Sequence, residues 1–142
     1  MGKQGVKHDD NKLQWALFDI HIRQELKFMC SIIRSMECEE EDLVSNLLVV
    51  LGFKNYILAA AMVMQLKGVT EEDIARIYTE GAKKYSPDDW KKVRPISRYL
   101  SAGMRHMRDG INTDDFGGSH WGYFCWNMIA MRWFEKQGKV IL

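Results

Sequence analysis

Apolar side chains recur at helical spacing along most of this chain. Between residues 13 and 36 they fall in steps of three and four, at Trp15, Phe18, Ile22, Leu26, Met29 and Ile33. Such steps place the side chains on one face of a helix. Further helices are expected at about 37–52, 54–67, 70–84, 95–109 and 119–136, and no alternating pattern indicates a strand. We therefore predict an all-α bundle of about five to six helices, forming a single domain over residues 1–142.

Local signals mark several of the expected helix ends. Thr70 with Asp73 three residues later resembles a capping box, in which both side chains satisfy backbone N–H groups. Gly52 and Gly68 are expected to end the two preceding helices, and Pro95 suits a first helical turn. The segments 86–94 and 110–118 are predicted to be loops.

Composition narrows the function classes. Hydrophobic residues make up 46% and charged residues 27% of the chain, with a formal net charge of +1. This balance does not suggest binding to nucleic acid or to a membrane surface. Polar residues interrupt the apolar region 43–66, which favours two core helices over a membrane span. The polar N-terminal residues predict no signal peptide, so we expect a cytoplasmic protein, in the host cytoplasm if a phage encodes it.

The three cysteines are predicted to be reduced. Cys30, Cys38 and Cys125 are odd in number and show no CxxC spacing. A disulfide framework or a zinc knuckle is therefore not expected, and buried thiols are the simpler interpretation.

The helix expected at 70–84 carries a charged stripe. Asp73, Arg76, Glu80 and Lys83 or Lys84 follow one another in steps of three and four. Carboxylates one or two turns apart can hold a divalent metal, and lysines can contact phosphate oxygens. The alternative is a solvated helix face with ordinary intrahelical ion pairs.

Two later helices add further polar groups. Arg98 and Arg105 lie seven residues apart on one side of a helix, with His106 adjacent, and the arginine fork suits phosphate. His120, Tyr123 and Asn127 form a polar line along an otherwise apolar last helix. Such a line is either a buried hydrogen-bond network or a site, because buried polar groups need partners.

Taken together these residues resemble a known family. The segments that carry the resemblance are Lys7-His-Asp-Asp, Lys12-Leu-Gln-Trp15, Glu72-Asp-Ile-Ala, Glu80-Gly-Ala-Lys-Lys-Tyr85, Asp89-Trp90, Arg98-Tyr-Leu-Ser-Ala, Arg105-His106, Asp114-Asp115, His120 and Asn127. The pattern is similar to the dATP/dGTP diphosphohydrolase family of phages and bacteria, which belongs with the MazG-like all-α nucleotide pyrophosphohydrolases. Within it, the MazZ-type dGTP pyrophosphohydrolases of phages are the most similar group.

The resemblance implies a reaction and a set of site residues. The reaction is cleavage of a purine (deoxy)nucleoside triphosphate, dGTP or GTP, to the monophosphate and pyrophosphate by metal-activated water. Mg²⁺ or Mn²⁺ is the implied cofactor, with Glu72, Asp73, Glu80, Asp115 and His120 as ligands. The implied catalytic residues are Glu72, Glu80, Lys83, Lys84, Arg105 and His106. The implied substrate-binding residues are Trp90, Arg98, Trp121, Tyr123 and Asn127.

The chain departs from the family pattern in three places. It lacks a clean pairing of an ExxE helix with an ExxD helix, and Tyr123 stands where many relatives carry a histidine. It also has an extra segment, residues 20–68, which is amphipathic and suited to an oligomer interface. A dimer or tetramer is therefore expected, and the acidic run 37–42 can then complete a neighbour's metal site.

Two other functions remain open at this point. An HD-type phosphohydrolase would use His106, His120 and aspartates and would release triphosphate or successive phosphates. A non-catalytic helical nucleotide-binding module would use the polar stripes only as buried networks.

Overall fold

The computed structural model describes residues 12–113 and 119–138. The elements are η1 (Trp15–Leu17), α1 (Ile20–Ser35), η2 (Glu40–Asp42), α2 (Leu43–Gly52), α3 (Tyr56–Lys67), α4 (Glu71–Lys84), η3 (Asp89–Lys92), α5 (Ser97–Thr113) and α6 (Ser119–Lys136). Those labelled η are short 3₁₀ turns. The described residues contain no strand, so the predicted all-α bundle is confirmed.

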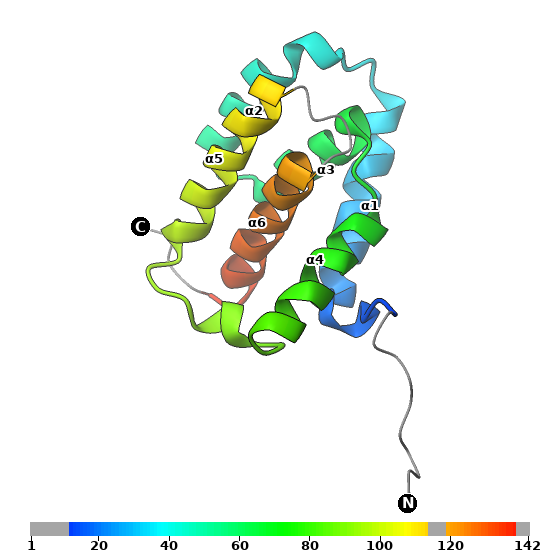
Figure 1. The fold of residues 1–142 in the computed structure, drawn as a ribbon. Coiled ribbons are helices and arrows are strands. Elements are labelled where there is room, and N and C mark those ends of the chain that lie inside the picture. Colours follow the sequence, from blue (N-terminus) through cyan, green and yellow to red (C-terminus); the bar gives the residue numbers. More distant parts are fainter. Residues whose placement is uncertain (1–11, 114–118, 139–142) are drawn as a thin grey trace, which may run out of the picture.

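Helix α6 is the centre of the bundle (Figure 1). Helices α3, α4 and α5 pack directly on it, while α1 and α2 pack mainly on α3. Trp121, Phe124 and Phe134 of α6 are fully buried. A helix that is apolar on nearly all sides belongs in a core, and α6 accordingly has neighbours on several sides.

The capping signals lie where the sequence predicts them, whereas Pro95, expected in the first turn of α5, lies two residues before that helix begins at Ser97. Thr70 Oγ1 accepts a hydrogen bond from Asp73 N (3.1 Å), and Asp73 Oδ2 accepts one from Thr70 N (2.9 Å), which completes the predicted capping box. Gly68 ends α3 with a φ of 73°, a left-handed conformation that glycine adopts without steric cost. Helix α6 spans the predicted residues.

Three predicted boundaries are wrong. The first helix begins only at Ile20, because the Asp19 carboxylate caps its start by accepting from the N–H groups of His21 and Ile22. The acidic run forms a 3₁₀ turn rather than the start of α2. Helix α5 continues to Thr113, so residues 110–113 are helical; residues 114–118 lie outside the described part.

Two of the cysteines are buried thiols, as predicted. Cys30 and Cys125 lie in the core, while Cys38 is half-buried, and all three are free. Burial raises the pKa of the Cys30 and Cys125 thiols, so both are neutral at pH 7. Within the described ranges, no helix has the length and apolarity that crossing a membrane requires.

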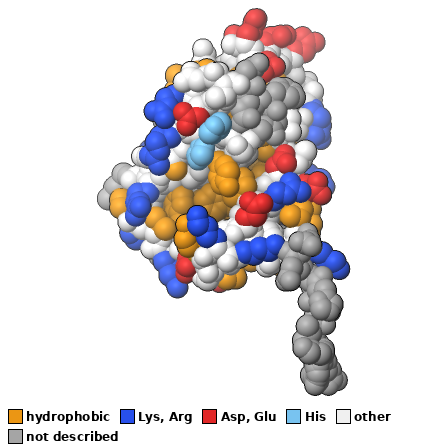
Figure 2. All heavy atoms as spheres, viewed as in Figure 1, with side chains coloured by type: hydrophobic (Ala, Val, Ile, Leu, Met, Phe, Trp, Pro, Cys, Tyr) orange, Lys and Arg blue, Asp and Glu red, His pale blue; other side chains and the backbone are white. Residues whose placement is uncertain are grey.

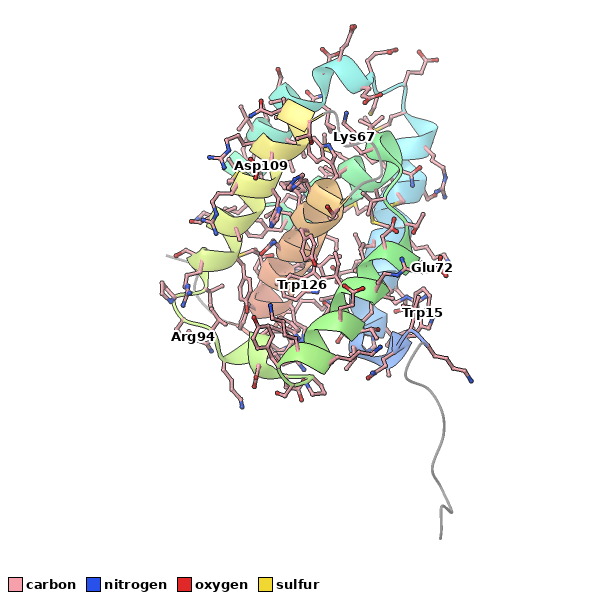
Figure 3. The ribbon with its side chains drawn as sticks, in the orientation of Figure 1. Trp15, Lys67, Glu72, Arg94, Asp109 and Trp126 are labelled. Atoms are coloured by element: carbon pink, nitrogen blue, oxygen red, sulfur yellow. The ribbon has the colours of Figure 1, made fainter. Side chains whose placement is uncertain are left out.

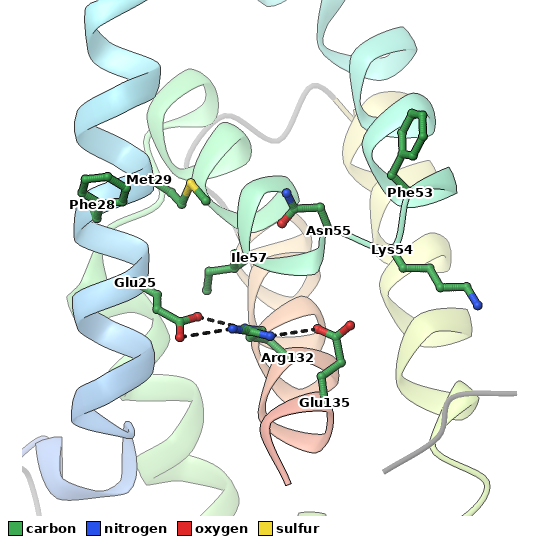
Figure 4. A pocket seen from close by; sticks show the side chains of 9 residues that line it. All are labelled: Glu25, Phe28, Met29, Phe53, Lys54, Asn55, Ile57, Arg132 and Glu135. Carbon is green, nitrogen blue, oxygen red and sulfur yellow. Dashed lines mark hydrogen bonds and ion pairs between the residues drawn. The ribbon is translucent and has the colours of Figure 1, made fainter. Parts of the chain in front are cut away.

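An ion-pair cluster ties α1 to α6 (Figure 4). Glu25 accepts from Arg132 Nε (2.9 Å), Arg132 Nη2 (3.3 Å) and Lys136 Nζ (2.5 Å). Burial alone would raise the pKa of Glu25, but these hydrogen bonds and charges outweigh it, and the pKa lies below its ordinary 4.5. The carboxylate is therefore more stable in the folded chain than in the unfolded chain.

Replacing Glu25 by glutamine is expected to lower the free energy of unfolding by about 1–2 kcal/mol at pH 7. Because the folded-state pKa is depressed, this stabilisation is present above the unfolded pKa and is lost as pH falls through the folded value. Urea unfolding of the wild type and the variant at pH 7 and near pH 3.5 measures the loss of stability and its decrease at low pH. Glu39→Gln is the control, because Glu39 is exposed and forms no ion pair with the described residues, and it should change stability by less than about 0.5 kcal/mol. An equal loss for Glu25→Gln at both pH values would contradict the assignment.

Candidate functional site

A groove runs between α4 and α5, with α6 as its floor. Both helices pack on α6 and have no extensive contact with each other. The groove contains a cavity of about 640 Å³. Figure 2 shows the hollow, with hydrophobic atoms at its base and charged side chains around it. This size is within the range of small-molecule sites.

The floor of the groove carries the polar line predicted for the last helix. Tyr123 and Asn127 both line the cavity. Asn127 is only 5% exposed, and its Nδ2 donates to the Tyr123 carbonyl oxygen at 2.7 Å. A carbonyl can only accept, so the amide orientation follows, and Oδ1 is left as a hydrogen-bond acceptor. The described residues donate no hydrogen bond to this oxygen.

Aromatic rings form one wall of the cavity. Trp126 lies on α6 between α4 and α5 (Figure 3) and packs edge-on against Tyr78 (5.6 Å between ring centroids), Trp90 (5.7 Å) and Tyr99 (5.7 Å). The Tyr99 hydroxyl donates to the Trp90 carbonyl, and burial raises the pKa of Tyr99 to about 12. Tyr99 therefore stays neutral and ties η3 to α5.

Two histidines meet where α5 faces α6. The Nδ1 atoms of His106 and His120 are 3.3 Å apart, and the Tyr123 ring stacks on His106 at 5.1 Å. One Nδ1 must carry a hydrogen and the other must accept it. Burial lowers the pKa of His106, and the nearby His120 and Arg105 lower it further. His106 is therefore a neutral imidazole at pH 7.

Charged groups stand around the groove. Glu80, Lys84 and Asp89 line the cavity. Lys84 Nζ lies 5.3 Å from the Tyr85 ring, and Asp89 lies 3.7 Å from Lys92 Nζ. Glu80 is exposed, and no hydrogen bond or ion pair engages its side chain in the described part of the chain. The groove thus combines an aromatic wall, an amide acceptor on its floor and charges of both signs.

A family model described as "dATP/dGTP diphosphohydrolase, N-terminal" matches residues 55–141. The match covers more than half of the chain and includes α3 to α6, which contain the groove. The chain belongs to the dATP/dGTP diphosphohydrolase family. The family description indicates a diphosphohydrolase with a nucleotide substrate. Neither the curated proteins nor the solved structures yielded a match.

The match shortens the extra segment that the sequence predicted for this member of the dATP/dGTP diphosphohydrolase family. The sequence places it at residues 20–68, but the family model already begins at residue 55. Helix α3 therefore lies within the family region. It packs against α6 and is part of the same core. Among the described elements, η1, α1, η2 and α2 precede the match.

The predicted metal ligands are not brought together among the described residues. Glu80 lines the cavity, while Glu72 is exposed two turns earlier on α4. Asp73 is held by the capping box and lies 3.8 Å from Arg76, and His120 faces His106. Asp115 lies outside the described residues. Residues 12–113 and 119–138 contain no group of three or more potential ligands, so on their own they do not form a metal site. The ligand set stays a prediction.

The predicted phosphate-binding residues are divided between the cavity and the surface. Lys84 lines the cavity, whereas Lys83 is exposed on α4 outside it. Arg98 and Arg105 are exposed two turns apart on α5 and do not line the cavity. They can reach a ligand only if its phosphates extend from the cavity towards α5.

Trp121 is not a base-stacking residue in this structure. It is 0% exposed, packs against Gly110 and Phe124, and does not line the cavity. Trp90 does line the cavity, but its ring is wedged among Trp126, Trp133 and Phe134 and contributes to the wall.

Sequence reasoning missed several aromatic residues of the groove. Tyr85, Tyr99 and Trp126 line the cavity but were not predicted as substrate contacts. For Trp126 a signal exists, since it follows Tyr123 by three residues and therefore lies beside the polar line. The apolar character of the whole helix conceals that signal.

Proposed function

We propose that this protein cleaves a purine deoxynucleoside triphosphate, dGTP above all, to the monophosphate and pyrophosphate. The observation that carries the proposal is a cavity with an aromatic wall and charged rim inside the region that matches the family. The proposed requirement for Mg²⁺ or Mn²⁺ follows from the family resemblance. Glu80, which lines the cavity, is the proposed metal ligand among the described residues.

The base is proposed to bind in the aromatic part of the cavity. Tyr123 and Trp126 offer ring surfaces, and the free Asn127 Oδ1 accepts a hydrogen bond. Guanine supplies donors at N1 and at its amino group, and adenine supplies one at its amino group. The Asn127 side chain is mostly buried but lines the cavity, so a ligand that enters the cavity and supplies a donor can bind Oδ1 in place of water.

The triphosphate is proposed to lie along the charged rim. With a net charge of only +1, the chain must balance the phosphates locally, through Lys84 and, further along α5, Arg98 and Arg105. Water attacks the α-phosphorus, the bond to the bridging oxygen breaks, and pyrophosphate leaves. We assign to His106, a neutral imidazole that lies beside the cavity rather than in its lining, the role of accepting the proton of the attacking water.

The test is product analysis with each of the common ribo- and deoxynucleoside triphosphates, in Mg²⁺, Mn²⁺ or chelator. We expect pyrophosphate and monophosphate in equal amounts, the highest rate with dGTP, and at least a 100-fold loss with chelator, on the order of what metal activation contributes. Free nucleoside with triphosphate would instead identify an HD-type phosphohydrolase. Nucleotide-dependent thermal stabilisation without any product would identify a binding module.

A further inference from the structure

Helix α2 is covered on only one side. Leu43 and Leu47 are buried against the bundle, where α2 packs on α3. The opposite side carries residues spaced as one helix face, namely Ser45, Leu48, Val49, Gly52 and Phe53, which we call the α2 face. Its apolar members are well exposed, Leu48 at 51%, Val49 at 59% and Phe53 at 82%. Clustered exposed apolar side chains on one face indicate a binding surface.

The α2 face contains a line of small residues that another helix could approach closely. Ser45, Val49 and Gly52 follow one another at steps of four and three, so they form a line along the helix. A Cβ atom added at Gly52 would meet nothing within 4 Å, so no described part of the chain fills that space. Small residues at both ends of the line allow another helix to approach closely.

Opposite charges stand at the two ends of the α2 face. Glu39, Glu41 and Asp42 are exposed at its start, and Lys54 is exposed just beyond its end, with the 10 residues of α2 spanning about 15 Å at the helical rise of about 1.5 Å per residue. None of these four side chains forms an ion pair within the described residues, although the intervening Glu40 pairs with Lys67 (2.6 Å). Asp42 makes no capping hydrogen bond with its side chain.

The backbone at Lys54 is held in an unusual conformation. Its φ is 59°, in the left-handed region that a residue with a Cβ adopts only at a steric cost. Phe53 and Lys54 are both exposed, and they border the pocket that Glu25 and Arg132 also line (Figure 4). The aromatic ring and the ammonium group are thus both presented at the end of the α2 face.

We propose that the α2 face binds the same face of a second copy of this chain, antiparallel, about a two-fold axis between Leu48 and Val49. In this register Ser45 lies opposite Gly52 of the second copy, and each Lys54 comes within one turn of Asp42 of the other. A parallel pairing would instead bring the acidic ends together. A two-fold interface uses one patch twice, so the patch must be complementary to itself. The α2 face meets this condition, because it is apolar at its centre and carries opposite charges at its two ends.

The interface uses a helix outside the family match, and it does not depend on the proposed reaction. Sedimentation equilibrium of the full chain tests it. The wild type is expected to show at least twice the 16.6 kDa chain mass at about 100 µM, as a small interface with a micromolar dissociation constant requires.

Val49→Asp is expected to reduce the wild-type mass at least by half while the helical circular dichroism is unchanged. The control is Ile20→Asp, a similar aliphatic residue exposed at the start of α1 and absent from the α2 face. A single-chain mass for the wild type, or an unchanged mass for Val49→Asp, would overturn the proposal.

A charge exchange tests the antiparallel register itself. Lys54→Glu and Asp42→Lys are each expected to raise the dissociation constant about 10-fold, because two symmetric contacts turn from attraction to repulsion. The double variant should recover most of the wild-type affinity. A double variant that binds no more tightly than either single variant would refute the register.

Discussion

Replacing Glu80 by glutamine is expected to reduce pyrophosphate release at least about 100-fold in kcat while the fold stays intact. Glu80 is exposed at the cavity, and no described hydrogen bond or ion pair depends on its carboxylate. Glutamine has nearly the same shape but lacks the negative charge that would hold a metal ion or orient water. The measurement is steady-state turnover of dGTP, with circular dichroism and urea unfolding of the same samples.

Two further variants make this result specific. Glu135→Gln, beside the separate cavity between α1 and α6, should keep wild-type turnover. Glu72→Gln, on the same helix as Glu80, should lose turnover if both carboxylates serve the reaction. Full activity in both the Glu72 and the Glu80 variants would show that the reaction centre does not use α4.

Replacing Gly110 by alanine is expected to lower the free energy of unfolding by about 2–4 kcal/mol. The added Cβ would lie 2.7 Å from Trp121 Cε2 and 2.8 Å from Trp121 Nε1. The indole is rigid and fully buried, with Phe124 against it at 6.0 Å between ring centroids. It cannot move aside, so α5 and α6 must separate locally to admit the new Cβ. Urea unfolding measures the loss.

Two other glycines provide matched controls. At Gly103 the closest atom to an added Cβ is Met128 Cε at 2.6 Å, the end of a flexible side chain, so Gly103→Ala should cost less than Gly110→Ala. At Gly81 nothing lies within 4 Å, so alanine should stabilise helix α4 by about 0.5–1 kcal/mol. Wild-type stability of Gly110→Ala would mean that the close contact with Trp121 carries no energetic weight.

Boundaries that depend on a few neighbouring residues could be predicted from the sequence. The capping box of Thr70 and Asp73 and the left-handed Gly68 are of this kind, because their hydrogen bonds and steric limits are local. The end of α5 is different. The sequence predicts a loop from Gly110, yet this residue is helical, and its lack of a side chain lets Trp121 of α6 pack against it.

The direction in which each side chain of α6 points could not be predicted. This helix is apolar on nearly all sides, so its periodicity does not separate a groove face from a core face. Trp121 and Tyr123 are only two residues apart, and both were expected to contact the base. Packing buries the first and leaves the second in the cavity.

By itself the sequence determined the all-helical class, most helix boundaries, the family resemblance and the polar line of α6. These rest on spacing and capping, which act over a few residues. Only the tertiary structure decided that α4 and α5 stand apart over α6, that His106 meets His120, and that Trp126 joins Tyr123 and Asn127 in the cavity. Those relations join residues from different helices, and they depend on how close-packed side chains set the spacing of the helices.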